Sequence, residues 1–108
     1  LATFASPAMA QSVGGEYSVR GTNLDGSAYK GSASILVTSE TTCEIYWTTG
    51  GTTSQGICMR NGNAFSAAYM MGDVIGLVIY EIKANGAMEG LWTIAGRNGS
   101  GTEILTPQ

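Results

Sequence analysis

Glycine-containing turn signals recur along the chain at short, nearly regular intervals, and this spacing is the strongest constraint on the fold. The segments between the turns are short and rich in Val, Ile, Tyr, Trp and Thr, which strands prefer. A polar break at residues 39–42 supplies one turn, and six dipeptides supply the others: Asp25-Gly26, Gly50-Gly51, Asn61-Gly62, Gly72-Asp73, Asn85-Gly86 and Asn98-Gly99. Seven short connections favour eight strands paired in chain order. We therefore predict an all-β domain, a single eight-stranded antiparallel up-and-down barrel, because closure removes exposed sheet edges.

Two similar hairpins indicate which side chains face the barrel interior. Each has a three-residue loop that ends in glycine, at Gly26 and at Gly86, which is typical of a type I turn closed by a left-handed glycine. This register gathers large apolar residues and strand glycines on one face, and we assign that face to the interior. The face holds Tyr17, Val19, Gly21, Tyr29, Gly31, Ala33 and Ile35 in the first hairpin, and Val78, Tyr80, Ile82, Met88, Gly90, Trp92 and Ile94 in the second.

The interior of an eight-stranded barrel is either filled by side chains or holds one small ligand. The chain has five Tyr, two Trp and two Phe residues, which is enough bulk to fill it, and we expect a filled core. The glycines that face tyrosines make room for the large rings. In the alternative, Tyr80, Trp92 and Trp47 contact a small apolar ligand in the lumen.

Cys43 and Cys58 lie directly opposite each other if Gly50 and Gly51 form a two-residue turn. A cross-strand disulfide is then plausible, with a small bulge to bring the Cα atoms closer than at a hydrogen-bonded pair. Two free thiols with a redox or metal role are the alternative, but two thiolates without histidine make a poor metal site. We predict the disulfide, which implies an oxidising compartment.

The first ten residues end in Ala8-Met9-Ala10, the small-x-small pattern that signal peptidase accepts. We predict that residues 1–10 are the remnant of a secretory signal peptide and that residues 11–108 form a single β-barrel domain. An apolar first strand is the alternative. The signal peptide and the disulfide both predict export.

Composition and charge exclude several classes of function. The chain has no histidine, which excludes His-based triads and the common His-containing zinc sites. Its net charge of −3 excludes the dense basic face of a nucleic-acid binder, and no segment approaches the length of an apolar membrane span. Glu81 and Glu89 lie on facing strands on the expected outer face, where nothing buries them, so we do not expect them to serve as an acid–base pair. We predict no catalytic residue, no metal and no cofactor, hence no enzyme.

An outer apolar patch, defined as Ile75, Leu77, Ile79 and Leu91, lies on the opposite face of the sixth and seventh strands. A closed barrel covers only one face of a strand, so something else must cover the patch or bind to it. One possibility is that the N-terminal arm or a loop covers the patch. We predict the alternative, in which the patch binds another protein or a second copy of this chain.

Three runs span most of residues 15–107. They are Gly15-x-Tyr17-x-Val19-x-Gly21-Thr-Asn-x-Asp25-Gly26-Ser-x-Tyr29-x-Gly31, then Cys43-x-Ile-x-Trp47-x-x-Gly50-Gly51…Gly56-x-Cys58-Met-Arg60, and Gly90-x-Trp92-Thr-Ile94…Gly101-Thr-Glu103-x-Leu105-Thr-Pro107. The runs resemble those of small exported bacterial proteins, a largely uncharacterised group in which some members carry the label fibronectin-binding protein. The predicted barrel is also similar in architecture to avidins and lipocalins, although a shared fold does not transfer their ligands.

The resemblance implies a protein of the bacterial periplasm, cell surface or exterior. Our leading prediction is a non-enzymatic binding protein that contacts a host matrix protein such as fibronectin, or an envelope partner, through the outer apolar patch. A carrier of a small hydrophobic ligand in the lumen is the first alternative. A structural subunit of a larger envelope complex is the second.

Overall fold

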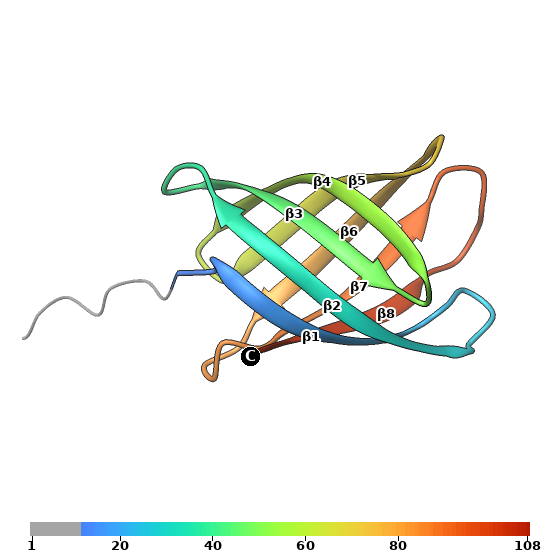
Figure 1. The fold of residues 1–108 in the computed structure, drawn as a ribbon, viewed down its shortest axis with the longest axis horizontal. Coiled ribbons are helices and arrows are strands. Elements are labelled where there is room, and N and C mark those ends of the chain that lie inside the picture. Colours follow the sequence, from blue (N-terminus) through green and yellow to red (C-terminus); the bar gives the residue numbers. More distant parts are fainter. Residues whose placement is uncertain (1–11) are drawn as a thin grey trace, which may run out of the picture.

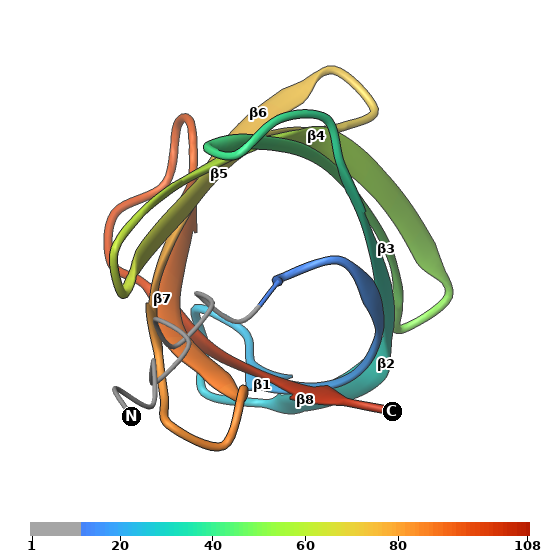
Figure 2. The same ribbon diagram turned by 90° about the vertical axis from the view of Figure 1, so that its left-hand side faces the viewer.

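A computed structural model of the chain describes residues 12–108, which form a closed antiparallel barrel of eight strands (Figures 1 and 2). Each strand pairs with its neighbours in chain order, and β1 pairs with β8 to close the barrel. The predicted meander barrel is therefore confirmed, whereas the predicted signal-peptide remnant at residues 1–10 lies outside the described residues. The strands are β1 (Gly15–Thr22), β2 (Ala28–Val37), β3 (Thr42–Thr49), β4 (Thr52–Asn61), β5 (Ala64–Met71), β6 (Val74–Ile82), β7 (Met88–Ile94) and β8 (Gly101–Pro107).

The two glycine-closed loops have the predicted conformation. The Gly26 amide donates to the Asn23 carbonyl over 2.9 Å, and the Gly86 amide donates to the Lys83 carbonyl over 2.9 Å. Both glycines have a positive φ, 88° and 85°, which residues with a Cβ rarely adopt. This turn fixes the register, so that Gly21 faces Tyr29 across β1 and β2, and Gly90 faces Tyr80 across β6 and β7.

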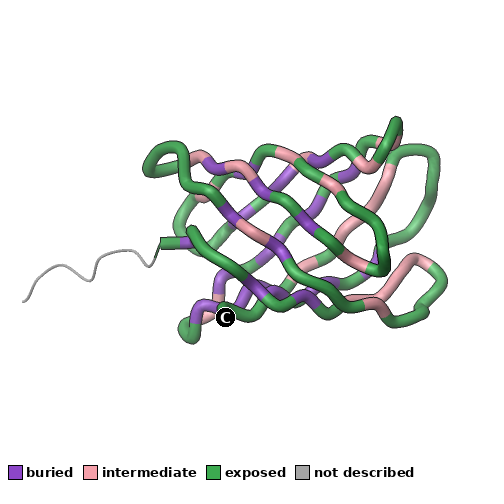
Figure 3. Tube along the Cα trace, viewed as in Figure 1, coloured by how far each residue is buried: buried purple, intermediate pink, exposed green. Residues whose placement is uncertain are grey.

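Buried and exposed residues alternate along most strands, as expected when one face lines a lumen (Figure 3). Every non-glycine member of the predicted interior face is either buried or packed against the buried core. The sequence pattern therefore assigns the inner and outer faces of these two hairpins correctly.

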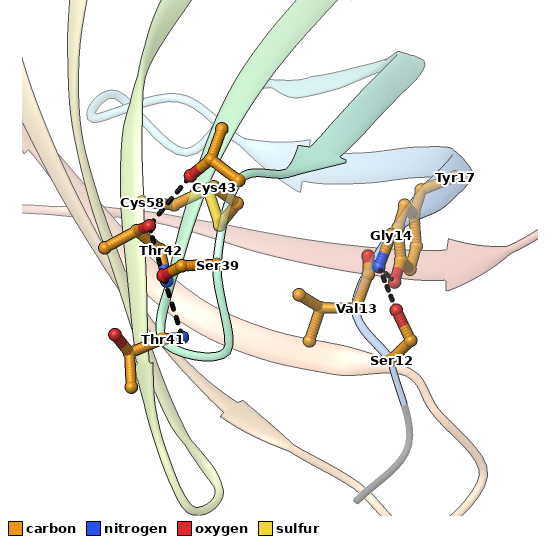
Figure 4. Close-up of a disulfide and its surroundings, with 10 residues drawn as sticks. Ser12, Val13, Gly14, Tyr17, Ser39, Thr41, Thr42, Cys43 and Cys58 are labelled. Atoms are coloured by element: carbon orange, nitrogen blue, oxygen red, sulfur yellow. Dashed lines mark hydrogen bonds between the residues drawn. A yellow bond between two sulfur atoms is a disulfide. The ribbon is translucent and has the colours of Figure 1, made fainter.

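The disulfide between Cys43 and Cys58 joins β3 to β4 with a Cα–Cα distance of 4.9 Å (Figure 4). The β3–β4 register runs without interruption to the two-residue turn at Gly50 and Gly51, where both φ angles are positive. The expected bulge is therefore wrong. It is not needed, because the regular pairing already brings the Cα atoms within the range that a disulfide spans.

Several of the most completely buried side chains lie toward the end of the barrel that carries the β2–β3, β4–β5 and β6–β7 loops. Phe65, Met88 and Leu105 are almost completely buried there. The first described residues pack across the same end, where Val13 is buried and accepts a hydrogen bond of 2.6 Å from the Tyr17 hydroxyl (Figure 4). These side chains and residues 12–14 close this end of the lumen except for a pocket of about 140 Å³.

Candidate functional site

The other end of the lumen is open. It holds a cavity of about 260 Å³ that reaches the surface between the β1–β2, β3–β4 and β5–β6 turns. The expectation of a filled core is wrong here, because short side chains such as Thr49, Thr52 and Ser54 do not span the lumen. The cavity is lined by Asn23, Tyr29, Trp47, Thr49, Gly50, Thr52, Ser54, Tyr69, Met71, Val78, Trp92 and Glu103.

Four aromatic rings from four different strands form much of the cavity wall. The Tyr29 and Trp92 rings are 6.2 Å apart between centroids and inclined at 74°. The Trp47 and Tyr69 rings are 5.1 Å apart and inclined at 61°. Edge-to-face pairs of this kind stabilise one another beyond the area they bury, so these contacts hold the four rings in place.

Strand glycines provide the space for these rings. A Cβ atom built at Gly76 would lie 2.1 Å from the Tyr69 ring, and one at Gly101 would lie 2.5 Å from the Trp92 indole. Two further glycine–aromatic pairs follow the same rule, Gly21 with Tyr29 and Gly90 with Tyr80. Each ring of these pairs therefore lies across a neighbouring strand at a point where no other residue type fits without displacement.

Glu103 lines the cavity, although only 6% of its surface is exposed. Its Oε1 atom accepts a hydrogen bond of 2.8 Å from the Tyr29 hydroxyl. Its Oε2 atom accepts one of 3.1 Å from the Trp47 indole nitrogen and another from the Tyr80 hydroxyl. Three aromatic side chains from β2, β3 and β6 thus converge on one carboxyl group of β8.

Burial raises the pKa of Glu103, and the hydrogen bonds from Tyr80, Tyr29 and Trp47 oppose part of that rise. No lysine or arginine contributes to the change in this pKa. The same desolvation, together with the negative charge of Glu103, raises the pKa of Tyr69 to about 12 and that of Tyr80 well above its usual value. The group at the centre of the site is therefore an acid with neutral donors around it and, within residues 12–108, no lysine or arginine among its hydrogen-bond partners.

The Trp92 indole nitrogen is buried and has no hydrogen-bond partner in the described part of the chain. It lies beside Gly101 in the wall, and its nearness to the Tyr29 hydroxyl opposes part of the rise in the pKa of Tyr29.

The structure brings together two of the three predicted lumen residues. Trp47 and Trp92 line the cavity, whereas Tyr80 lies beneath it and binds Glu103 through its hydroxyl group. Glu81 and Glu89 pair across β6 and β7 on the outer surface, and Glu81 forms an ion pair of 3.2 Å with Lys83.

The predicted outer apolar patch is exposed. Ile75, Leu77, Ile79 and Leu91 are 55%, 57%, 63% and 49% exposed, and Ile57, Met59 and Met70 extend the apolar surface onto β4 and β5. The described part of the N-terminal arm, residues 12–14, packs at the end of the barrel instead and leaves the patch uncovered.

Sequence reasoning missed Glu103, although a signal for it was present. In β8 the residue alternates in phase with Leu105, an apolar residue at a core position, so its side chain points inward. An acidic residue at an inward position of a strand is uncommon and indicates a buried polar site. The sequence pattern does not indicate which groups donate hydrogen bonds to this carboxyl group, because the donors lie on three other strands.

No protein-family model and no curated protein matches this chain. Solved structures similar to it include a redesigned β-barrel (TM-score 0.76, 17% identity, 89% of this chain and 91% of that one). A second is the redesigned barrel mFAP1 bound to DFHBI, with a TM-score of 0.74 and 18% identity over 87% of this chain and 94% of that one. A third is a de novo designed fluorescence-activating barrel, with a TM-score of 0.73 and 14% identity over 95% of this chain and 100% of that one. At these identities the similarity shows the barrel fold alone.

Two further observations concern residues 12–108. They contain no cluster of three or more acidic or cysteine side chains arranged to hold a metal ion. They also contain no helix with the length and apolar character that a membrane crossing requires.

Proposed function

We propose that this protein is a carrier or receptor for a small, largely apolar molecule, which it binds in the open half of the lumen. The observation that carries the proposal is the cavity of about 260 Å³, walled by aromatic rings and holding one buried acid. Binding sites for small molecules combine an apolar wall with a few convergent polar groups in this way. The volume suits a ligand of one or two rings, and a redesigned barrel of the same architecture is bound to the small molecule DFHBI.

The proposal is tested by NMR titration with p-cresol, a probe of one ring. The two tryptophans each give one indole N–H signal, and both side chains line the cavity. We expect saturable shifts of both signals, and loss of those shifts in Ser54→Phe, which fills the cavity. Gln55→Phe is the matched control, because the next residue of β4 is exposed and does not line the cavity. Shifts that survive in Ser54→Phe, or that are confined to outer residues, contradict a lumen site.

A second candidate function is binding of another protein through the outer apolar patch. The specific observation is that the patch is exposed and continuous with Ile57, Met59 and Met70 on the adjacent strands. Contiguous apolar surface of this kind marks interaction sites. A host matrix protein such as fibronectin, an envelope partner or a structural role in an envelope complex each fits this candidate.

We further propose that the protein is non-enzymatic and is exported by a bacterium. The disulfide supports an oxidising compartment. Native mass spectrometry of the protein purified from its own envelope fraction tests export. We expect a chain that begins at Gln11 and is lighter by two hydrogens, and a further mass would be the resident ligand. A chain that retains residues 1–10 with two free thiols would contradict export.

A further inference from the structure

Of the residues within 12–108 that line the cavity, Glu103 alone carries a carboxyl group, and none is a lysine or an arginine. Buried charges in proteins are normally paired with an opposite charge or a metal ion. The three donors to Glu103 are neutral, so they satisfy its lone pairs without supplying a positive charge. The cavity therefore lacks one component of the usual arrangement around a buried acid, and that component is a cation.

The aromatic wall favours the same kind of ligand. Faces of Trp and Tyr rings carry partial negative charge and attract cations, most strongly where water is excluded. Four such rings line the cavity, and within each edge-to-face pair the rings are steeply inclined, at 74° and 61°. Rings at such angles enclose a space from several sides, as in the aromatic cages that hold quaternary ammonium groups. The protein as a whole is also acidic, with a net charge of −3, which favours the approach of a cation.

We propose that the lumen binds an organic cation, an alkylammonium group carried on a small apolar body. The cationic group pairs with Glu103, and its apolar substituents lie against Tyr29, Trp47, Tyr69 and Trp92. This inference rests on the proposed lumen function and adds the charge of the ligand to it.

Glu103→Gln removes the negative charge of this side chain while keeping its size and its hydrogen-bonding partners. The amide oxygen of glutamine can accept the hydrogen bonds from Trp47 and Tyr80. Its amide nitrogen can donate to the Tyr29 hydroxyl, which has a second acceptor in the Thr102 carbonyl at 3.2 Å. Every polar group of the network then keeps a partner, so the variant should fold while lacking the negative charge.

The experiment compares two probes of nearly identical shape by calorimetric titration, benzyltrimethylammonium and its uncharged isostere neopentylbenzene. In the native protein we expect the cation to bind at least about tenfold more tightly than the isostere. In Glu103→Gln we expect this preference for the cation over the isostere to disappear. Glu81→Gln, which removes a carboxylate from the outer surface, is the matched control and should keep the preference.

A pH series provides a second measurement that needs no variant. The titratable groups that face Glu103 are Tyr29, Tyr69 and Tyr80, which stay neutral throughout the acidic range. Affinity for benzyltrimethylammonium should therefore fall as Glu103 is protonated, and affinity for neopentylbenzene should not. If the isostere binds as tightly as the cation, the charge inference is wrong while the lumen site stands. If neither probe binds, both the charge inference and the proposed lumen function are wrong.

Discussion

At the residue scale, the Glu103 carboxyl group accepts hydrogen bonds from aromatic side chains on three other strands. Replacing Glu103 with leucine would remove the acceptor from the Trp47 nitrogen and the Tyr80 hydroxyl, whereas Tyr29 keeps the Thr102 carbonyl. Leaving two buried donors unpaired costs about 2–6 kcal/mol. We expect Glu103→Leu to lose stability in that range in chemical denaturation, and Glu103→Gln to lose much less. Equal losses in the two variants would mean that packing, not hydrogen bonding, sets the role of this residue.

The buried tyrosines give the stability a defined dependence on alkaline pH. Burial and the charge of Glu103 raise the pKa of Tyr69 to about 12 and also raise the pKa values of Tyr29 and Tyr80. Between pH 10 and 12 the unfolded chain loses these protons while the folded chain keeps them, so stability is full below pH 10 and falls as pH rises. We expect the free energy of unfolding to decrease over this window.

Denaturant titrations at about pH 8, 10 and 11 measure this decrease. Tyr69→Phe removes one of the titrating groups and should make the decrease less steep. A free energy of unfolding that stays constant up to about pH 12 would show that the tyrosine hydroxyls are not buried in the folded protein.

The same linkage acts in the acidic range with Glu103. Because its folded pKa is raised by burial, its contribution to stability is full below its unfolded pKa and is lost as pH rises through the folded value. We expect the stability difference between Glu103→Gln and the native protein to shift in favour of the variant as the pH rises above the ordinary pKa of glutamate. A pH-independent difference would show that the carboxyl group titrates normally.

At the scale of elements, the pairing of strand glycines with aromatic rings positions the site. Gly76→Ala would place a Cβ atom 2.1 Å from the Tyr69 ring on the neighbouring strand. The ring must then move away from Trp47 and from its hydrogen bond to the Thr93 carbonyl. Overpacking of this kind costs about 1–3 kcal/mol, and we expect that loss of stability together with weaker ligand binding.

A double-mutant cycle with Tyr69→Ala isolates this steric cause. Without the ring, alanine at position 76 has space, so the double variant should be more stable than the sum of the two single effects predicts. Additive losses would show that Gly76 is needed for its backbone alone.

The disulfide acts on the β3–β4 hairpin, at the end of the barrel opposite the cavity. It joins residues 15 apart in sequence, for which restriction of the unfolded chain contributes about 3 kcal/mol. We expect Cys43→Ala with Cys58→Ala to lower the unfolding free energy by about this amount. The affinity for p-cresol should stay unchanged, because neither cysteine lines the cavity. Loss of binding at a temperature where the variant is still folded would contradict this separation.

At the scale of the whole molecule, the barrel has two unlike outer sides. The outward residues of β1 and the first part of β2 are polar, whereas the outer apolar patch and its neighbours cover β4 to β7. We expect Leu77→Glu with Leu91→Glu to leave the barrel folded and to abolish self-association or partner binding, measured by analytical ultracentrifugation and pull-down. Ser32→Glu with Thr106→Glu is the control on the polar side. An unchanged oligomeric state and an unchanged pull-down would exclude the patch as an interface.

Local information in the sequence determined the strands, the turns and the inner face. Turn glycines and the period of two are properties of neighbouring residues, so they predict the hairpin registers and place Tyr17, Val78 and Met88 in the core. The cysteine pairing also follows from counting across one turn. The exposed outer apolar patch follows for the same reason, because it lies on the other face of the same strands.

Only closure of the barrel decided how the lumen is filled and where the acid lies. Glu103 on β8 meets Tyr29, Trp47 and Tyr80 because bending the sheet into a ring brings β8 across from strands far away in sequence. Whether the interior is filled depends on the sum of side-chain volumes in each layer around that ring. Alternation along one strand does not contain that sum, so residue pattern predicted the wall of the lumen but not the space inside it.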